Sequence, residues 1–108
     1  MDYSKVIETL YSCATECSRC YDACMFEKDK EAMKRCMMMD QDCADICNMS
    51  AKILERETEN AEILLRLCTE ICERCAEECE NHQQEHCKKC ATACRECAEL
   101  CHHHAEVQ

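Results

Sequence analysis

The sequence predicts an all-α fold, an antiparallel up-down-up-down four-helix bundle with a cysteine-lined core. Two observations support this prediction. The chain of 108 residues has no glycine and no proline, the two residues that break helices most strongly. Sixteen of its residues are cysteine, and most neighbouring cysteines are three or four positions apart. That spacing keeps side chains on one stripe of an α-helix, so thiols stand where a bundle normally has leucine.

Four helices are expected because three charged or polar stretches interrupt this pattern. The first stretch contains Asp29, a good N-cap residue for the helix that follows. Short connections make consecutive helices antiparallel. At this length we expect residues 1–108 to form a single domain. The expected helices are Tyr3 to Glu27, Lys30 to Glu57, Asn60 to Asn81 and Gln83 to His104.

The first two helices differ in their stripes. The first has the spacing C-x3-C-x2-C-x3-C and ends it at Cys24. The second has only three cysteines, because Asp40 occupies the stripe position between Cys36 and Cys43. We hypothesise that Asp40 accepts a hydrogen bond from a histidine near the end of the bundle or binds an ion.

The last two helices repeat the pattern. The third helix has the same cysteine spacing as the first, with Thr58 and Asn60 as candidate N-caps and Asn81 as a candidate C-cap. The fourth helix adds a fifth cysteine, Cys101. This internal repetition supports a bundle in which every helix turns a stripe toward a common axis.

Extending each stripe beyond its cysteines predicts two different ends. Aliphatic residues meet at one end, which we call the apolar plug: Val6, Leu10, Leu54 and Leu65, with Ile53 and Leu64 beside them. Soft or borderline ligands meet at the other end, which we call the mouth: Met33, His82, His86 and the last thiols, Cys24, Cys36, Cys79 and Cys87. Folding alone does not require this polarity. Met37, Met38 and Met39 cannot all face inward and are expected mostly in packing or at the surface.

Composition narrows the classes of function. A net charge of -10 argues against nucleic acid and against an anionic membrane surface. No apolar run approaches the length of a membrane span, and the first residues lack the pattern of a secretory signal, so we expect a cytoplasmic protein. Val, Ile, Leu and Phe together number only 14. Ordinary apolar burial therefore stabilises this chain weakly, and the thiols must contribute.

A high cysteine content is also typical of disulfide scaffolds and iron–sulfur proteins, but the helical register fits neither class well. Residues four apart on a helix have Cβ atoms about 5–6 Å apart, whereas a disulfide needs about 3.8 Å. Disulfides between helices remain open, in a structural or redox protein. Cysteine as a small packing residue accounts for one or two thiols, but not for sixteen. Iron–sulfur motifs have cysteines in loops followed by proline, which this chain lacks.

The pattern instead indicates soft metal ions, because two thiolates at i and i+4 can hold one ion without straining the helix. Thiolates select Cu(I), zinc and iron–sulfur clusters. One Cu(I) per thiolate leaves the core neutral, whereas zinc on four thiolates leaves a charge of −2 with no basic residue on any stripe. The candidate ligands are Cys13, Cys17, Cys20, Cys24, Cys36, Cys43, Cys47, Cys68, Cys72, Cys75, Cys79, Cys87, Cys90, Cys94, Cys97 and Cys101, with His82, His86 and Met33 at the mouth.

Nearly the whole chain resembles the bacterial copper storage proteins. The resemblance lies in the repeated C-x3-C spacing, in the segment Cys43-Ala44-Asp45-Ile46-Cys47 and in the histidines before Cys87. It implies a four-helix bundle, often a homotetramer, that stores many Cu(I) ions and takes them in at a His/Met end. By position, the core cysteines would be the ligands, and His82 and His86 would lie where ions enter. The chain looks like the cytosolic branch, but Asp40 and the three cysteines of the second helix depart from the pattern.

We therefore expect a cytoplasmic store or buffer of multiple Cu(I) ions. The sequence contains no catalytic motif, so we do not expect an enzyme. The expected partners are copper ions and, as a candidate donor, a copper chaperone, with neither nucleic acid nor membrane. A disulfide-linked helical protein and a general zinc or soft-metal buffer are the alternatives.

Overall fold

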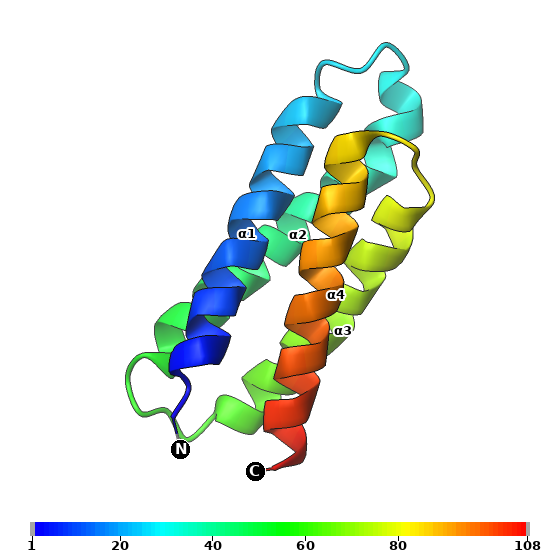
Figure 1. Cartoon of the computed structure of the whole chain (residues 1–108). Helices are drawn as coiled ribbons and strands as arrows, with labels where there is room; N and C mark the ends of the chain where they lie inside the picture. The colour runs from blue at the N-terminus through cyan, green and yellow to red at the C-terminus, as the bar shows by residue number, and fades with distance from the viewer. Residues whose placement is uncertain (1, 108) are drawn as a thin grey trace.

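The computed structural model describes residues 2–107, which form an antiparallel four-helix bundle without strands. Each helix packs against two others, α1 and α3 both lying between α2 and α4 (Figure 1). The rod measures 46 × 20 × 17 Å. The predicted all-α bundle is confirmed. Its helices are α1 (Ser4–Cys24), α2 (Lys30–Leu54), α3 (Ala61–Glu80) and α4 (Glu85–Glu106).

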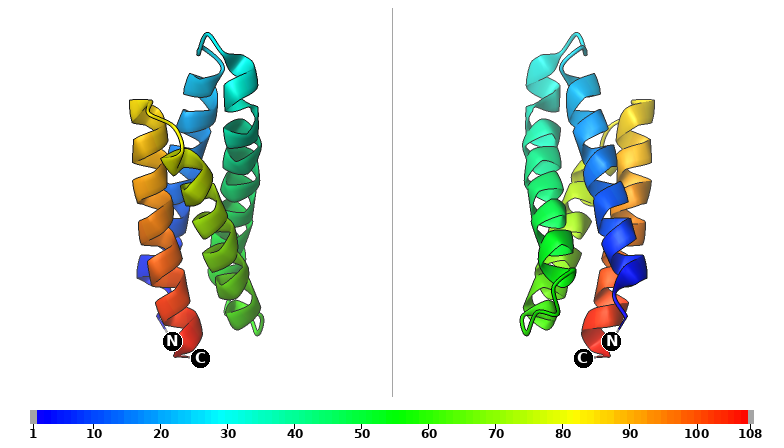
Figure 2. Two further views of the ribbon diagram at one scale, coloured as in Figure 1. Left: turned by 90° about the vertical axis from the view of Figure 1, so that its right-hand side faces the viewer. Right: turned by 90° about the vertical axis from the view of Figure 1, so that its left-hand side faces the viewer.

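The two ends of the rod are built from different connections. The α1–α2 and α3–α4 connections lie at the mouth, and the α1–α2 loop projects farther along the axis (Figure 1). The α2–α3 connection and the two chain termini lie at the opposite end, beside the apolar plug (Figure 2). The up-down-up-down order therefore gathers residues distant in sequence at each end.

The α1–α2 connection begins earlier than predicted. Helix α1 ends at Cys24 instead of Glu27, and the backbone N–H of Glu27 donates to the carbonyl of Cys24 at 3.2 Å. This tight i to i+3 turn releases the Glu27 side chain from the helix. The predicted N-cap of α2, Asp29, is confirmed, because its side chain accepts a hydrogen bond from the backbone N–H of Ala32 at 3.1 Å.

The α2–α3 connection also shortens a predicted helix. Helix α2 ends at Leu54, not Glu57, because Glu57 has a φ of 40° and leaves the right-handed helical region. Thr58 is a turn residue, whose hydroxyl accepts from the backbone N–H of Asn60 at 3.0 Å. Asn60 holds the N-cap position of α3, but its side chain makes no capping hydrogen bond.

After the α3–α4 connection, helix α4 begins and ends two residues later than predicted. Asn81 is the C-cap of α3, as predicted, although in a right-handed conformation. Gln84 is extended, so α4 begins at Glu85 rather than Gln83 and continues to Glu106 rather than His104. These are differences of one helical half-turn and leave the cysteine stripe in place.

The apolar plug forms as predicted. Its four aliphatic side chains are buried, and the Tyr11 hydroxyl donates to the Glu55 carboxylate beside it, tying α1 to α2. Leu64 is buried and Ile53 is half-buried. Burial of this kind stabilises a bundle by about 1.5–3 kcal/mol per side chain.

Small residues flank the cysteine stripes. Alanine side chains let neighbouring helices approach closely, which brings thiols from facing helices within reach of one another. The buried alanines are Ala14, Ala44, Ala51, Ala61, Ala76, Ala91, Ala98 and Ala105.

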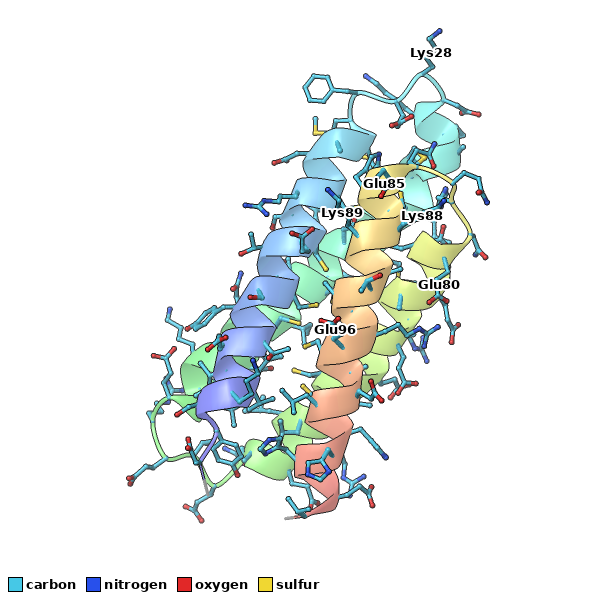
Figure 3. The ribbon with its side chains drawn as sticks, viewed as in Figure 1. Lys28, Glu80, Glu85, Lys88, Lys89 and Glu96 are labelled. Carbon is cyan, nitrogen blue, oxygen red and sulfur yellow. The ribbon has the colours of Figure 1, made fainter. Side chains whose placement is uncertain are left out.

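Charged side chains cover the outside of the rod. Lys28 extends from the tip of the α1–α2 loop, and Lys88, Lys89 and Glu96 point away from α4, while sulfur atoms lie between the helices (Figure 3). Within residues 2–107, no helix combines the length and the apolar character needed to cross a bilayer.

Candidate metal centre

The sixteen cysteines all lie in the interior of the bundle. Each has a free thiol and is at most 1% exposed. Among the described residues, the buried polar or charged side chains are Asp40 and Ser50, so the thiols face no buried Lys or Arg. The core is therefore a continuous, nearly uncharged column of soft donor atoms.

The shortest sulfur–sulfur distances cross between helices. Cys47 and Cys72, on α2 and α3, have Sγ atoms 3.6 Å apart, whereas Cys43 and Cys47 on one helix are 3.9 Å apart. Cys94 on α4 lies 3.7 Å from both Cys13 and Cys17 on α1. The i and i+4 pairs read from the sequence therefore merge into clusters that span two to four helices.

These clusters overlap, because several thiols belong to more than one of them. Within each cluster, four ligand atoms lie within 4.8 Å of one another. Shared members such as Cys13, Cys17 and Cys94 are placed to bridge neighbouring sites. The clusters include Cys13–Cys47–Cys72–Cys97, Cys13–Cys17–Cys43–Cys94, Cys17–Cys75–Cys90–Cys94, Cys20–Asp40–Cys79–Cys90 and Cys20–Cys24–His86–Cys87.

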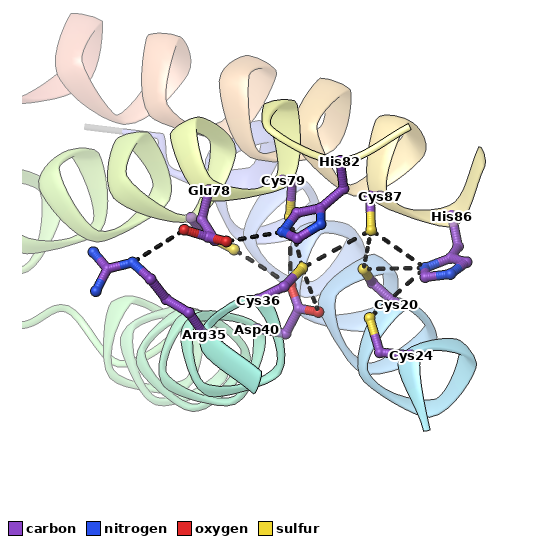
Figure 4. A network of polar contacts seen from close by, with 11 residues as sticks. Cys20, Cys24, Arg35, Cys36, Asp40, Glu78, Cys79, His82, His86 and Cys87 are labelled. Atoms are coloured by element: carbon purple, nitrogen blue, oxygen red, sulfur yellow. Dashed lines mark hydrogen bonds and ion pairs between the residues drawn. The ribbon is translucent and has the colours of Figure 1, made fainter. Parts of the chain in front are cut away.

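Asp40 interrupts the column toward the mouth. Its Oδ1 accepts hydrogen bonds from the thiols of Cys90 at 3.3 Å and Cys75 at 3.5 Å. Oδ1 also accepts from Cys79 at 3.7 Å, and Oδ2 accepts from Cys36 at 3.9 Å (Figure 4). Burial raises the pKa of Asp40 to about 10, and the neighbouring sulfur of Cys90 adds to the shift. The carboxyl group is therefore neutral at pH 7 in the metal-free protein.

The hypothesis of a histidine donor to Asp40 is wrong, because the hydrogen bonds that Asp40 receives come from thiols. The two mouth histidines bind other carboxylates. His82 Nε2 lies 2.8 Å from Glu78 Oε2, and His86 Nε2 lies 3.0 Å from Glu27 Oε2. Asp40 sits deeper than both rings, among the sulfur atoms.

His86 faces the thiols at the mouth. Its Nδ1 lies 3.5 Å from the sulfur of Cys20, 3.6 Å from that of Cys87 and 3.9 Å from that of Cys24 (Figure 4). The ring is half-buried. Of the two predicted histidines, His86 thus completes a mixed group of three thiols and one imidazole.

His82 and Met33 occupy the same end but differ from His86. Glu78, which contacts His82, also accepts from Arg35 Nε at 3.0 Å, so this ring is tied to a salt-bridged carboxylate (Figure 4). Met33 is 1% exposed and belongs to the core. Met37, Met38 and Met39 match the prediction that they lie mostly in packing or at the surface: Met37 and Met39 are partly buried against the core, and Met38 is 59% exposed.

Cys36 and Cys87, from two different helices, meet at the mouth. Cys36 has no helical partner three or four residues away, yet its sulfur lies 3.9 Å from Cys87 and 3.8 Å from Cys79. Facing helices thus supply the partner that its own helix lacks.

Burial keeps the thiols of Cys24 and Cys87, at the mouth, protonated in the absence of metal. Burial raises the pKa of Cys24 to about 12, with a further contribution from the neighbouring Cys36. Burial likewise raises the pKa of Cys87. A metal ion that binds here must displace protons, so binding is coupled to proton release.

Comparison with known proteins agrees with this geometry. The sequence model of the copper storage proteins matches residues 1–106. The chain belongs to the copper storage protein family. Its similarity therefore extends over the whole bundle, including all sixteen cysteines.

Three known proteins show how similar this copper storage protein is to its relatives. The uncharacterized cysteine-rich protein YhjQ of Bacillus subtilis (strain 168) is 35% identical over 84 residues, which are 78% of each chain. Cu(I)-bound BsCsp3 of Bacillus subtilis superposes with a TM-score of 0.91 at 34% identity, covering 95% of this chain and 97% of that chain. The cytosolic copper storage protein of Streptomyces lividans, with five coppers, also has a TM-score of 0.91, at 36% identity and coverage of 95% and 91%.

Two residues at the mouth, Glu27 and Glu78, were not predicted from the sequence. Glu27 and Glu78 bind the outer nitrogens of His86 and His82. Glu78 lies four residues before His82 on the same helix, a spacing that predicts the contact. Glu27 is 59 positions from His86, and no local signal relates the two.

Proposed function

We propose that this chain stores several Cu(I) ions along the axis of its bundle, bound by the core cysteine thiolates. The observation that supports this most directly is the column of sixteen buried thiols arranged in overlapping four-ligand groups. Packing alone accounts for one or two cysteines in a core, but not for sixteen on one axis. Two thiolates that hold one soft ion lie a few ångströms apart.

The charge of the core favours Cu(I) over a divalent ion. Each bound Cu(I) replaces one thiol proton, so a loaded column stays close to neutral. Zinc on four thiolates leaves a charge of −2 at each site, and among residues 2–107 no Lys or Arg is buried to balance it. The names of the two structural relatives, one Cu(I)-bound and one with five coppers, support the same ion.

The test is anaerobic titration of the reduced, metal-free protein with Cu(I) in the presence of a chromogenic Cu(I) chelator. Native mass measurement then counts the ions, and a parallel titration adds excess Zn(II). We expect many Cu(I) ions per chain, retained against zinc. Preferential zinc binding indicates instead a general zinc buffer.

Thiol titration under denaturing conditions tests the redox alternative. In our proposal the isolated protein yields close to sixteen free thiols. A reproducible shortfall of pairs of thiols in protein purified without oxygen indicates interhelical disulfides and a structural or redox role.

We propose that the ions enter at the mouth, where His82, His86 and Met33 accompany the outermost thiols. The supporting contacts are those of His86 Nδ1 with three sulfur atoms. The opposite end is filled by buried aliphatic side chains. In this proposal ions pass inward from thiol to thiol through the shared members of the clusters.

We also propose that Asp40 takes part in the passage of ions between the mouth and the deeper thiols. It shares a four-atom group with Cys20, Cys79 and Cys90. Replacement of Asp40 by alanine should change the loading rate or the capacity. If neither changes, Asp40 has no role in copper handling.

We also propose where this protein acts, what delivers its copper and how many chains assemble. We propose a cytoplasmic, non-enzymatic protein in which residues 1–108 act as one domain and a copper chaperone delivers the ions; the Streptomyces lividans relative is named as cytosolic. We further propose a homotetramer, for which the exposed apolar side chains of Ile63 and Met38 offer contact surface, 68% and 59% exposed. Native mass spectrometry of the protein measures the number of chains.

A further inference from the structure

Glu27, in the α1–α2 loop, holds the beginning of α4. One carboxylate oxygen, Oε1, accepts from the side-chain amide of Gln84 at 3.5 Å, and the other, Oε2, lies 3.0 Å from Nε2 of His86. The ring of His86 therefore lies between a carboxylate on its outer side and the mouth thiols on its inner side.

The contact with Glu27 determines which nitrogen of His86 carries the proton. A carboxylate can only accept hydrogen bonds, so Nε2 must be the donor in this contact. In the neutral ring, Nδ1 is then left with its lone pair. That lone pair is directed at the sulfur atoms of Cys20, Cys87 and Cys24. The nitrogen able to bind a cation thus faces the thiols.

The arrangement at His82 is different. Its carboxylate partner, Glu78, lies on its own helix and is shared with Arg35 of α2. Glu27 instead comes from a loop that projects beyond the rest of the mouth (Figure 1) and crosses to α4. Glu27 therefore contacts the ring of His86 and links the α1–α2 loop to the beginning of α4.

We propose that Glu27 is a positioning residue that orients His86, with Nδ1 toward Cys20, Cys24 and Cys87, so that this group captures the first Cu(I) ion at the mouth. The inference rests on the proposed function of Cu(I) storage. Carboxylates that bind the outer nitrogen of a metal-binding histidine act in this way, and their loss typically costs about 10–100-fold in metal affinity or activity.

The first experiment compares three variants with the unchanged protein. Glu27→Ala removes the acceptor, Glu27→Gln keeps an acceptor oxygen without the charge, and Asp22→Asn removes an exposed carboxylate from the same end of α1 as a control. We expect Glu27→Ala to lower the affinity for the first equivalent of Cu(I) about 10–100-fold, Glu27→Gln to restore most of it, and Asp22→Asn to have no effect. Equal losses in Glu27→Ala and Asp22→Asn overturn the proposal, because they indicate a general charge effect.

The second experiment measures whether Glu27 acts through His86. Long-range ¹H–¹⁵N NMR of the metal-free protein reports which ring nitrogen is protonated, and we expect the Nε2–H form to lose its dominance in Glu27→Ala. In a double-mutant cycle, Glu27→Ala should have no additional effect on first-ion affinity in a His86→Ala background. Additive losses mean that Glu27 acts independently of the histidine and contradict the proposal. Thermal unfolding of each metal-free variant checks that the bundle is intact.

The two proposals fail in distinguishable ways. If the unchanged protein takes up no more than one Cu(I) ion, storage itself is wrong. If it takes up many ions but Glu27→Ala matches it in first-ion affinity and in the His86 tautomer, storage stands and the positioning role is wrong.

Discussion

The two ends of this bundle have the same helical scaffold and opposite chemistry. At the closed end, aliphatic side chains such as Leu10 and Leu65 are fully buried. At the mouth, thiols continue to the last helical turn, and the half-buried rings of His82 and His86 take the place of leucine. Apolar burial is therefore concentrated at the closed end, and candidate ligands continue to the mouth, where we propose that ions enter.

This difference shows how a small protein can fold around a core that is weakly hydrophobic. Cysteine behaves as a small apolar side chain when its thiol is protonated, so the sulfur column packs acceptably without metal. The plug adds aliphatic burial at one end. Toward the mouth, ion pairs link neighbouring helices: Arg35 with Glu78 joins α2 to α3, and Arg95 with Glu80 joins α4 to α3.

The largest effect on stability is expected at the plug. Leu65→Ala removes a fully buried side chain and should lower the free energy of unfolding of the metal-free protein by about 2–5 kcal/mol. The exposed Leu67 on the same helix serves as control, since Leu67→Ala should change it by no more than about 0.5 kcal/mol. Urea denaturation measures both. Copper capacity of the folded Leu65→Ala protein should be unchanged, and a large loss of capacity contradicts the separation of the two ends.

The effect of removing thiols should depend on depth. Replacing Cys20 and Cys24 by serine, or Cys97 and Cys101 by serine, removes two thiols in each case and should cost roughly one or two ions of capacity. The initial rate of Cu(I) uptake should fall only for the mouth pair. Stopped-flow loading and mass measurement separate rate from capacity. Abolition of all binding by either double substitution is incompatible with semi-independent sites.

Asp40, between the two ends, should make the stability of the metal-free protein depend on pH. Its pKa is raised to about 10 in the folded state, above the usual 3.8, so the folded state binds more protons between these values. Its stabilising contribution is complete below about pH 4 and decreases as the pH rises toward 10, by at most about 1.4 kcal/mol per pH unit. Asp40→Asn should remove this slope. Denaturation midpoints of both proteins between pH 5 and 8 measure this slope. If the midpoints of the two proteins change with pH in the same way, Asp40 is not the cause of the pH dependence.

The smallest effect is expected in the α2–α3 connection at the closed end. Glu57 has a positive φ, which asparagine tolerates better than glutamate. Glu57→Asn should therefore stabilise the fold by up to about 1 kcal/mol and leave copper loading unchanged. Glu59→Asn, in the same loop, is the matched control and should not stabilise. If both substitutions raise the free energy of unfolding equally, backbone strain at Glu57 is not the cause.

Local periodicity predicted the helices, the inward stripes and the plug, because each depends on residues a few positions apart. Asp29 was recognised as an N-cap for the same reason. The helix ends were less well predicted: Glu27 and Glu57 leave their helices through backbone turns that have no glycine or proline to mark them.

The arrangement of the sulfur atoms could not be obtained in this way. That Cys94 contacts Cys13 and Cys17 depends on the axial register of α4 against α1, which tertiary packing determines. The contact of Glu27 with His86 depends on a loop conformation and joins residues 59 positions apart. Sequence spacing thus identified the candidate ligands, and only the fold groups them into clusters.

The most direct test of a container built from thiols is the end point of a Cu(I) titration of the reduced protein, read by native mass spectrometry without oxygen. Our account predicts a capacity well above one ion per cysteine pair and approaching about one Cu(I) per thiol, on the order of sixteen per chain. An end point of one or two ions, with most thiols still reactive toward a thiol reagent, contradicts it.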